Sequence, residues 1–336
     1  MMIFNIELPK KINKFNYFKR NEEGGCTLYS FNGVLGNTQY IIANYPELEI
    51  EKDFTIVDST LNAIIKLNPN VEVKLNDKSI VATSQKGKYI GKYVSEVCPS
   101  PFMEYNKTLP IDLGVLVKAS QFVSNNEKKP ILTGVNVNEN GVVIATDSFR
   151  VYRYNNDNGV ENPTSITIPA KLITLADSLF TNKLLFLKYN KNSFCISDNN
   201  ISLVGQLLDG NYPAVGAIFN QLNVDSCIIN KSELLEAIDF TKITGANVDT
   251  KKVPIYATLN KNHFTGESDE MFEKDISYSG DEVVFDALFF ETVLKSFNED
   301  EINIATLKRE RGSMSKFFGN NANEQIVLLG IAKETK

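Results

Sequence analysis

The chain has 336 residues, the composition of an ordinary globular protein and a formal net charge of −6. This length exceeds what one hydrophobic core usually organises, so we expect two or three domains. No apolar run approaches the ~18–20 residues of a membrane span, and the N-terminus becomes charged too early for a signal peptide. We therefore expect a cytoplasmic protein with no membrane partner. The negative charge alone argues against binding nucleic acid by bulk electrostatic attraction.

The first third of the chain contains a helix candidate at residues 9–20, which reads PKKINKFNYFKR. The segment QYIIANYPELEIE at residues 39–51 predicts a strand, a turn and a returning strand. Residues 54–94 then run from a β-branched strand into a helix with apolar residues at helical spacing. Alternating strands follow that helix.

The middle third repeats this order. A helix candidate at residues 112–125 precedes VVIATDSFRVYRY at residues 142–154, which predicts a strand, a turn and a returning strand. Residues 166–208 begin with a short strand at ITIP, continue through a helix and end in alternating strands.

The last third repeats it again. A helix candidate at residues 231–245 is followed by the strand–turn–strand segment at residues 262–278. Residues 283–331 then give an entry strand, a helix and three more strands.

These three copies define an internal repeat. The entry strands near Ile56, Ile168 and Phe285 recur at about 112 residues, one third of the chain. The repeat predicts three α+β domains at residues 1–108, 109–221 and 222–336, each with two helices packed on antiparallel sheet.

Three motifs carry a resemblance to a known family. They are ATDSFR at residues 145–150, LLDGNYP at residues 207–213 and KKPILTG at residues 128–134. Through them the segment 109–221 resembles the DNA polymerase III beta subunit, the bacterial sliding clamp. The third domain is similar mainly in pattern. The first is the most divergent and keeps ANYPELEIE at residues 43–51.

The resemblance implies a ring made of three repeated clamp domains in each copy of a head-to-tail homodimer. Such a ring encircles duplex DNA without sequence specificity, holds a replicative DNA polymerase and depends on a separate clamp loader. It needs no cofactor. Encirclement also explains the net charge, because a closed ring requires no strong phosphate binding, and strong binding would impede sliding.

The resemblance also implies two kinds of binding residue. Basic side chains that face the encircled DNA are expected at Lys10, Lys14, Arg20, Lys118, Lys128, Lys129, Lys171, Lys251 and Lys252. A partner-peptide pocket is expected between the middle and third domains, lined by Leu132, Thr146, Ser148, Phe149, Arg150, Val151, Pro213, Ile218, Val253, Phe289, Val327, Leu329, Gly330 and Ile331. Phe149 replaces a smaller or polar residue of the family, so we expect a narrower pocket.

The sequence contains no motif for catalysis or metal binding. His263 is the only histidine, and the four cysteines form no CxxC pair, so they are expected to act as small hydrophobes. The acidic segment at residues 267–275 predicts a charged outer surface rather than a cation site. Two alternatives to a clamp remain. One is a clamp-like scaffold that binds peptides without closing a ring, and the other is a metal-dependent nuclease.

Overall fold

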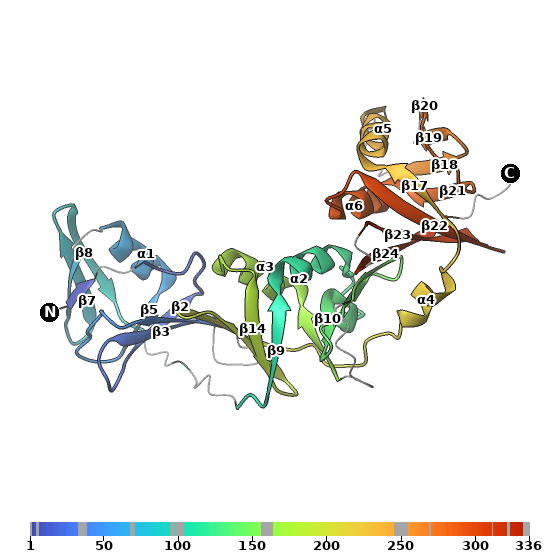
Figure 1. Cartoon of the computed structure of the whole chain (residues 1–336). Coiled ribbons are helices and arrows are strands. Elements are labelled where there is room, and N and C mark those ends of the chain that lie inside the picture. The colour runs from blue at the N-terminus through green and yellow to red at the C-terminus, as the bar shows by residue number, and fades with distance from the viewer. Residues whose placement is uncertain are drawn as a thin grey trace. The chain divides into compact units, whose positions relative to one another are not determined.

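The computed structural model describes residues 2–4, 7–32, 39–67, 71–94, 98, 104–155, 164–244, 255–268, 270–310, 312–320 and 323–331 (Figure 1). The chain forms two compact units. The first contains Met1–Val117 and Ile168–Asp209, and the second contains Lys118–Thr167 and Gly210–Lys336. No helix in the described part of the chain is long and apolar enough to cross a membrane.

The first unit contains an eight-stranded antiparallel sheet in the order β5-β2-β3-β4-β16-β15-β14-β9 and a four-stranded sheet in the order β1-β6-β7-β8. The strands are β1 (Met2–Phe4), β2 (Phe15–Arg20), β3 (Cys26–Phe31), β4 (Tyr40–Tyr45), β5 (Phe54–Val57), β6 (Val71–Leu75), β7 (Ser79–Ser84), β8 (Gly87–Lys92), β9 (Lys107–Asp112), β14 (Leu184–Tyr189), β15 (Ser193–Ser197) and β16 (Ile201–Gln206).

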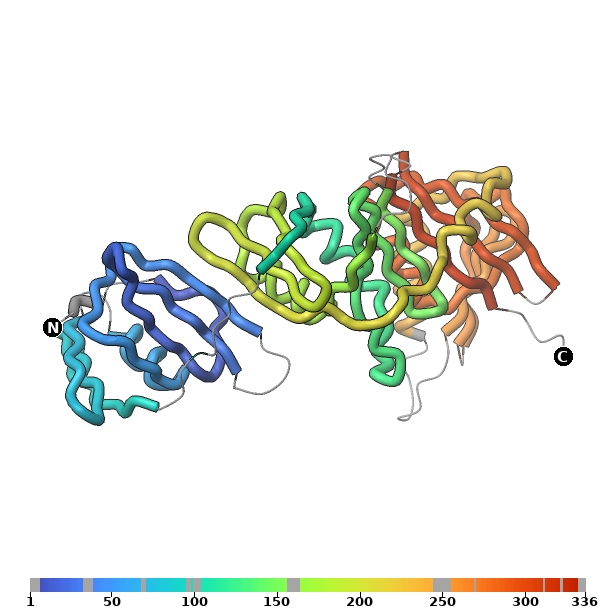
Figure 2. The backbone as a smooth tube through the Cα atoms, turned by 90° about the horizontal axis from the view of Figure 1, so that it is seen from below, coloured from blue at the N-terminus to red at the C-terminus, as the bar shows by residue number. Residues whose placement is uncertain are grey.

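The second unit is built in the same way, with an eight-stranded sheet in the order β13-β10-β11-β12-β24-β23-β22-β17 and a four-stranded sheet in the order β20-β19-β18-β21. In Figure 2 the red strand β24 lies beside the green strand β12, although they are far apart in sequence. The strands are β10 (Gly134–Asn138), β11 (Val143–Thr146), β12 (Arg150–Tyr154), β13 (Ser165–Pro169), β17 (Ser226–Asn230), β18 (Tyr256–Asn260), β19 (His263–Glu267), β20 (Met271–Asp275), β21 (Val283–Asp286), β22 (Glu301–Arg309), β23 (Gly312–Phe318) and β24 (Glu324–Gly330).

Among the described residues, a helix follows the fifth strand of every repeat and the first strand of the second and third repeats, and α4 follows β16. Asp286 caps α6 by accepting hydrogen bonds from the backbone N–H groups of Leu288 and Phe289, at 2.9 and 3.0 Å, which fixes where that helix begins. The helices are α1 (Asp58–Lys66), α2 (Leu113–Ala119), α3 (Ala170–Leu179), α4 (Gly216–Gln221), α5 (Lys231–Thr244) and α6 (Ala287–Ser296), with short 3₁₀ turns η1 (Ser120–Phe122) and η2 (Pro130–Thr133).

The strand order confirms the internal repeat. In β1–β8, in β9–β16 and in β17–β24, the fifth strand pairs with the second and the sixth pairs with the first. Each set therefore forms two four-stranded halves, and α1, α3 and α6 follow the fifth strand in every copy. The helices predicted at residues 112–125 and 231–245 are confirmed by α2 with η1 and by α5. The domain boundaries at 108 and 221 remain a prediction.

The helix predicted at residues 9–20 is wrong. Residues 7–14 have no regular secondary structure, and Phe15–Arg20 forms strand β2. Burial along β2 alternates with period two, since Asn16 and Phe18 are fully buried while Phe15 and Tyr17 are only partly buried. Pairing with β3 on one side and β5 on the other then satisfies the backbone.

The returning strand predicted within residues 39–51 is also wrong. Only β4 forms there, and the hairpin of the first repeat is β3–β4. Pro46 cannot donate a backbone hydrogen bond to a ladder. Leu48 and Ile50 are instead buried as part of the core of the first unit.

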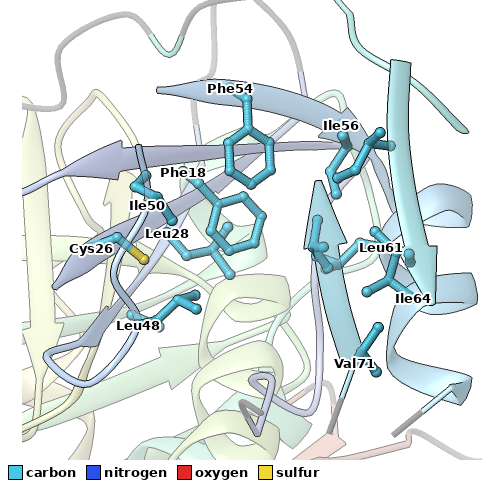
Figure 3. Packing of buried hydrophobic residues seen from close by; sticks show 14 residues of the cluster. Phe18, Cys26, Leu28, Leu48, Ile50, Phe54, Ile56, Leu61, Ile64 and Val71 are labelled. Carbon is cyan, nitrogen blue, oxygen red and sulfur yellow. The ribbon is translucent and has the colours of Figure 1, made fainter. Parts of the chain in front are cut away.

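That core joins strands and helix of the first repeat. Phe18 stacks on Phe54 with ring centroids 4.8 Å apart, and Leu61 and Ile64 of α1 are fully buried against the same cluster (Figure 3). The apolar positions of α1 are three residues apart, so they lie on one helical face. Burial of this face attaches α1 to the sheets.

Candidate functional site

A small apolar cavity opens on the surface of the second unit. Its volume is about 150 Å³, well below the several hundred Å³ of a typical small-molecule pocket. Such a cavity fits one or two apolar side chains of a peptide. It is lined by Leu132, Thr146, Ser148, Phe149, Val151, Pro213, Val215, Ile218, Val327 and Leu329.

The turn between β11 and β12 forms one side of this cavity. Ser148 has φ +82°, a conformation that costs energy for a residue with a side chain. The Asp147 carboxylate compensates by accepting hydrogen bonds from the backbone N–H groups of Phe149 and Arg150, at 2.9 and 2.7 Å. The turn therefore presents the Phe149 ring outward, where 57% of its surface is exposed.

Tyr212 joins the segment that leads into α4 to the same turn. Its hydroxyl oxygen accepts a hydrogen bond of 3.0 Å from the backbone N–H of Thr146. Burial raises the pKa of this phenol, so the hydroxyl stays protonated at neutral pH. The contact places Pro213 and Val215 beside the apolar residues of β24.

Arg150 points away from the cavity and into the protein. Its guanidinium lies 2.7 Å from the Asp147 carboxylate and donates a hydrogen bond of 3.3 Å to the backbone carbonyl of Gln121. It also lies over the rings of Phe122 and Phe289, 5.2 and 4.4 Å from their centres. Only 7% of Arg150 is exposed. Its role is therefore to hold α6 and η1 against β12.

The structure brings together nine of the predicted pocket residues, all of which line the cavity: Leu132, Thr146, Ser148, Phe149, Val151, Pro213, Ile218, Val327 and Leu329. Phe289 lies behind Phe149, with ring centroids 5.8 Å apart. Gly330 is the last residue of β24, and Ile331, which follows it, donates its backbone N–H to the Val284 carbonyl. Val253 lies outside the described residues.

Val215 also lines the cavity and was missed by sequence reasoning. It precedes Ile218 by three residues at the start of α4, and it is 9% exposed. The apolar pair at helical spacing after Pro213 was the available signal.

The predicted DNA-facing residues fall into different environments. Lys128, Lys129 and Lys171 are exposed. Lys118 instead forms an ion pair with Glu324 of β24 at 3.1 Å. The ammonium of Lys14 lies 5.1 Å from the centre of the Phe15 ring. Lys10 and Arg20 are exposed in the first unit, and Lys251 and Lys252 lie outside the described residues.

A second cavity, of about 740 Å³, lies in the first unit and includes Leu8, Lys10, Leu179 and Ile201 in its lining. Ile201 and Glu324 occupy equivalent positions in the repeats. Ile201 is the first residue of β16, which pairs with β4, and Glu324 is the first residue of β24, which pairs with β12. In the second unit, Lys118 of α2 contacts Glu324. Ile201 in the lining of this cavity therefore corresponds to the residue that α2 contacts in the second unit.

Among the described residues, no group of three or more His, Cys, Asp or Glu side chains is arranged to hold a metal ion. The four cysteines have free thiols, and burial raises the pKa of Cys26 and of Cys98 to about 12. His263 is the first residue of β19 and lies 3.4 Å from Asp275 and 3.8 Å from Glu273.

Comparison with known proteins agrees with the fold. Residues 113–214 match the family model described as DNA polymerase III beta subunit, central domain. The beta sliding clamp of Staphylococcus aureus is 22% identical over 227 residues, which are 64% of this chain and 60% of that relative. The chain thus spans 60% of the length of the curated relative that it matches.

Solved structures show the same fold over nearly the whole chain. A DNA polymerase III beta subunit from Eubacterium rectale has a TM-score of 0.80 at 16% identity and covers 95% of this chain and 91% of its own. The beta clamp of Helicobacter pylori, bound to a DNA ligase peptide, has a TM-score of 0.76 at 15% identity and covers 98% of this chain and 94% of its own.

The repeated strand order and these matches define the class of protein, a three-repeat clamp fold. Within that class, the chain is similar to the bacterial DNA polymerase III beta subunit, and its residues 113–214 match the model of the central domain of that family.

Proposed function

We propose that this chain is a DNA sliding clamp: a homodimeric ring that encircles duplex DNA and tethers a replicative polymerase. The observation that carries the proposal is the strand order. Pairing of β4 with β16 and of β12 with β24 joins consecutive repeats, and it leaves β8 and β20 as edges of their four-stranded sheets.

These two edges support closure of a ring. An edge strand presents unpaired backbone groups that can extend a sheet into another chain. Pairing β20 of one copy with β8 of a second copy repeats the two internal junctions. Two such contacts between two copies close a ring with head-to-tail symmetry. The alternative of an open scaffold is not favoured, because the divergent first repeat keeps β8.

Encirclement fits the distribution of charge. The net charge of −6 gives little overall attraction to DNA. Exposed lysines such as Lys128 and Lys129 can touch phosphates briefly, which steadies the duplex without arresting it.

The cavity of the second unit supports capture of a peptide. A related clamp from Helicobacter pylori is bound to a DNA ligase peptide. Apolar walls and a volume of about 150 Å³ suit the apolar tip of a short segment from the polymerase. Burial of one such side chain contributes about 1.5–3 kcal/mol. This modest gain suits exchange between partners. We propose that the chain performs no chemistry itself and that a separate loader opens the ring.

Retention on DNA tests this function. Purified protein is loaded on nicked circular DNA with a clamp loader, and free protein is removed by gel filtration. A clamp stays with circular DNA and leaves after the circle is cut to a linear form. Equal loss from circular and linear DNA contradicts encirclement. Sedimentation at micromolar concentration must also give twice the chain mass of 37.6 kDa.

A further inference from the structure

The edge strands β8 and β20, which are not used in either internal junction, carry opposite charges. On β8, Lys88 and Lys92 are exposed, and on β20, Glu273 and Asp275 are exposed. Each edge also exposes one large apolar side chain, which is Ile90 (63% exposed) on β8 and Met271 (62% exposed) on β20. Lys274 turns to the other face of β20, where it forms an ion pair with Glu236 of α5.

The repeat fixes which residue of β20 corresponds to Tyr40 in the first internal junction. In the first repeat, the ladders lead from Val57 through Phe15 and Phe31 to Tyr40. In the third repeat, the same steps lead from Asp286 through Tyr256 and Glu267 to Met271. Val57 and Asp286 both immediately precede the helix of their repeat. Met271 is therefore the equivalent of Tyr40.

The residue of β8 that corresponds to Val204 follows from a shared turn. The backbone N–H of Asn76 donates to the Ser79 carbonyl, and that of Asn190 donates to the Ser193 carbonyl. Ser79 then pairs with Lys92, and Ser193 pairs with Gln206. Counting back two residues from each partner makes Ile90 the equivalent of Val204.

Tyr40 pairs with Val204 in the internal junction between β4 and β16. The same register therefore sets Met271 of one copy opposite Ile90 of the other. An antiparallel step of two residues then places Glu273 opposite Lys88. In this register an apolar side chain of β20 lies opposite an apolar side chain of β8, and an acidic side chain lies opposite a basic one.

The faces of the strands agree with this register. Phe272 lies on the helix side of β20, where its ring stacks on Phe240 of α5 at 5.2 Å. Tyr89 lies on the helix side of β8, where its hydroxyl is 3.3 Å from that of Thr60 in α1. These two aromatic residues are opposite each other in the same register, so both faces of the new junction match.

Accepting that the chain closes a ring, as proposed above, we propose that the charges of β8 and β20 select head-to-tail closure in this register. Two copies joined through β8 alone would set lysines beside lysines, and two joined through β20 would set carboxylates beside carboxylates. Like charges directly opposite each other destabilise a strand pair. The internal junction between β4 and β16 instead has apolar pairs such as Ala43 with Ile201. Its two strands belong to the same chain, so complementary charges are not needed to select their pairing.

A charge swap tests the register. The variants Lys88→Glu and Glu273→Lys should each raise the dimer Kd about tenfold or more in low salt, measured by sedimentation over a range of protein concentrations. The double variant should return the Kd to within about threefold of the native value. Lys188→Glu, on an exposed position of β14, is the matched control and should leave the Kd unchanged.

Two variants, each with one cysteine introduced at an edge strand, test the direction of the contact. Ile90→Cys and Met271→Cys, each in a Cys227→Ser background, should give a disulfide-linked dimer only when the two proteins are mixed and oxidised. Linkage within either variant alone contradicts head-to-tail closure. If neither charge reversal changes the dimer Kd, the proposed register is wrong, and the proposed clamp function still stands. A chain that stays monomeric at all concentrations overturns the register and ring closure together.

Discussion

The guanidinium of Arg150 lies 4.4 Å from the centre of the Phe289 ring, and the two residues belong to different repeats of the chain. Arg150 begins β12, and Phe289 is in the first turn of α6. The same guanidinium is paired with Asp147 and stacks on Phe122. One buried charge therefore joins the turn beside the cavity to the helix of the next repeat.

Replacing Arg150 with Lys should destabilise the second unit. Lysine keeps the charge but loses the planar fork and the stacking surface, so we expect the free energy of unfolding to fall by about 1–3 kcal/mol. Hydrogen exchange in β12 and α6 should accelerate, as measured by mass spectrometry. Arg20→Lys, at the exposed end of β2, is the control. Unchanged exchange in α6 would show that Arg150 does not hold that helix.

Phe149 should control which peptide tips the cavity accepts. Phe149→Ala opens the side of the cavity next to Phe289, so we expect tighter binding of peptides with a large aromatic tip and weaker binding of those with a small aliphatic tip. Because Phe149 is 57% exposed, stability should change by less than about 1 kcal/mol. Calorimetry with paired peptides measures the preference. Phe186→Ala, 61% exposed on β14, is the matched control. The same preference in native protein and Phe149→Ala would contradict this role.

Most of the architecture could be predicted from local pattern. The helices α3, α5 and α6 have apolar residues at helical spacing, and the strands that precede α3 and α6 are rich in β-branched or aromatic residues. Residues 9–20 could not be predicted in this way. Five basic residues and scattered aromatics resemble an amphipathic helix, and only pairing with both β3 and β5 decides for a strand.

The candidate site was predictable where it follows from one turn and not where it depends on distant contacts. The turn at Asp147 and Ser148 is local, so its role could be inferred from the motif. The position of Phe289 behind Phe149, rather than in the cavity lining, depends on β12 pairing with β24. Sequence spacing contains no information on that pairing, which joins segments about half the chain apart.

Buried thiols should make the protein sensitive to alkaline pH. Burial raises the pKa of Cys26 and of Cys98 to about 12 in the folded chain. The folded state holds these protons more tightly than the unfolded state, so their contribution to stability is complete below pH ~8.5 and is lost as the pH rises toward 12. Urea midpoints should therefore fall across this range.

The same burial predicts the order of alkylation. At pH 8, iodoacetamide should modify Cys227, which is partly exposed, before Cys26, Cys98 and Cys195. Peptide mass spectrometry measures the order, and protein denatured in urea is the control in which all four should react at similar rates. Early modification of Cys98 in native protein would contradict the burial of this thiol.

Lys128 and Lys129 should contribute to retention on DNA. Both are exposed in the turn before η2, where flexible ammonium groups can touch phosphates. Reversing both to Glu replaces attraction with repulsion, so the half-life on circular DNA should fall severalfold in low salt and differ little from native above about 0.3 M salt, where the Debye length is short. Lys188→Glu with Lys183→Glu, also exposed, controls for net charge. Dimer mass and peptide affinity should stay native in both double variants. Native retention of the Lys128/Lys129 variant at every salt concentration would show that these lysines do not face the encircled duplex.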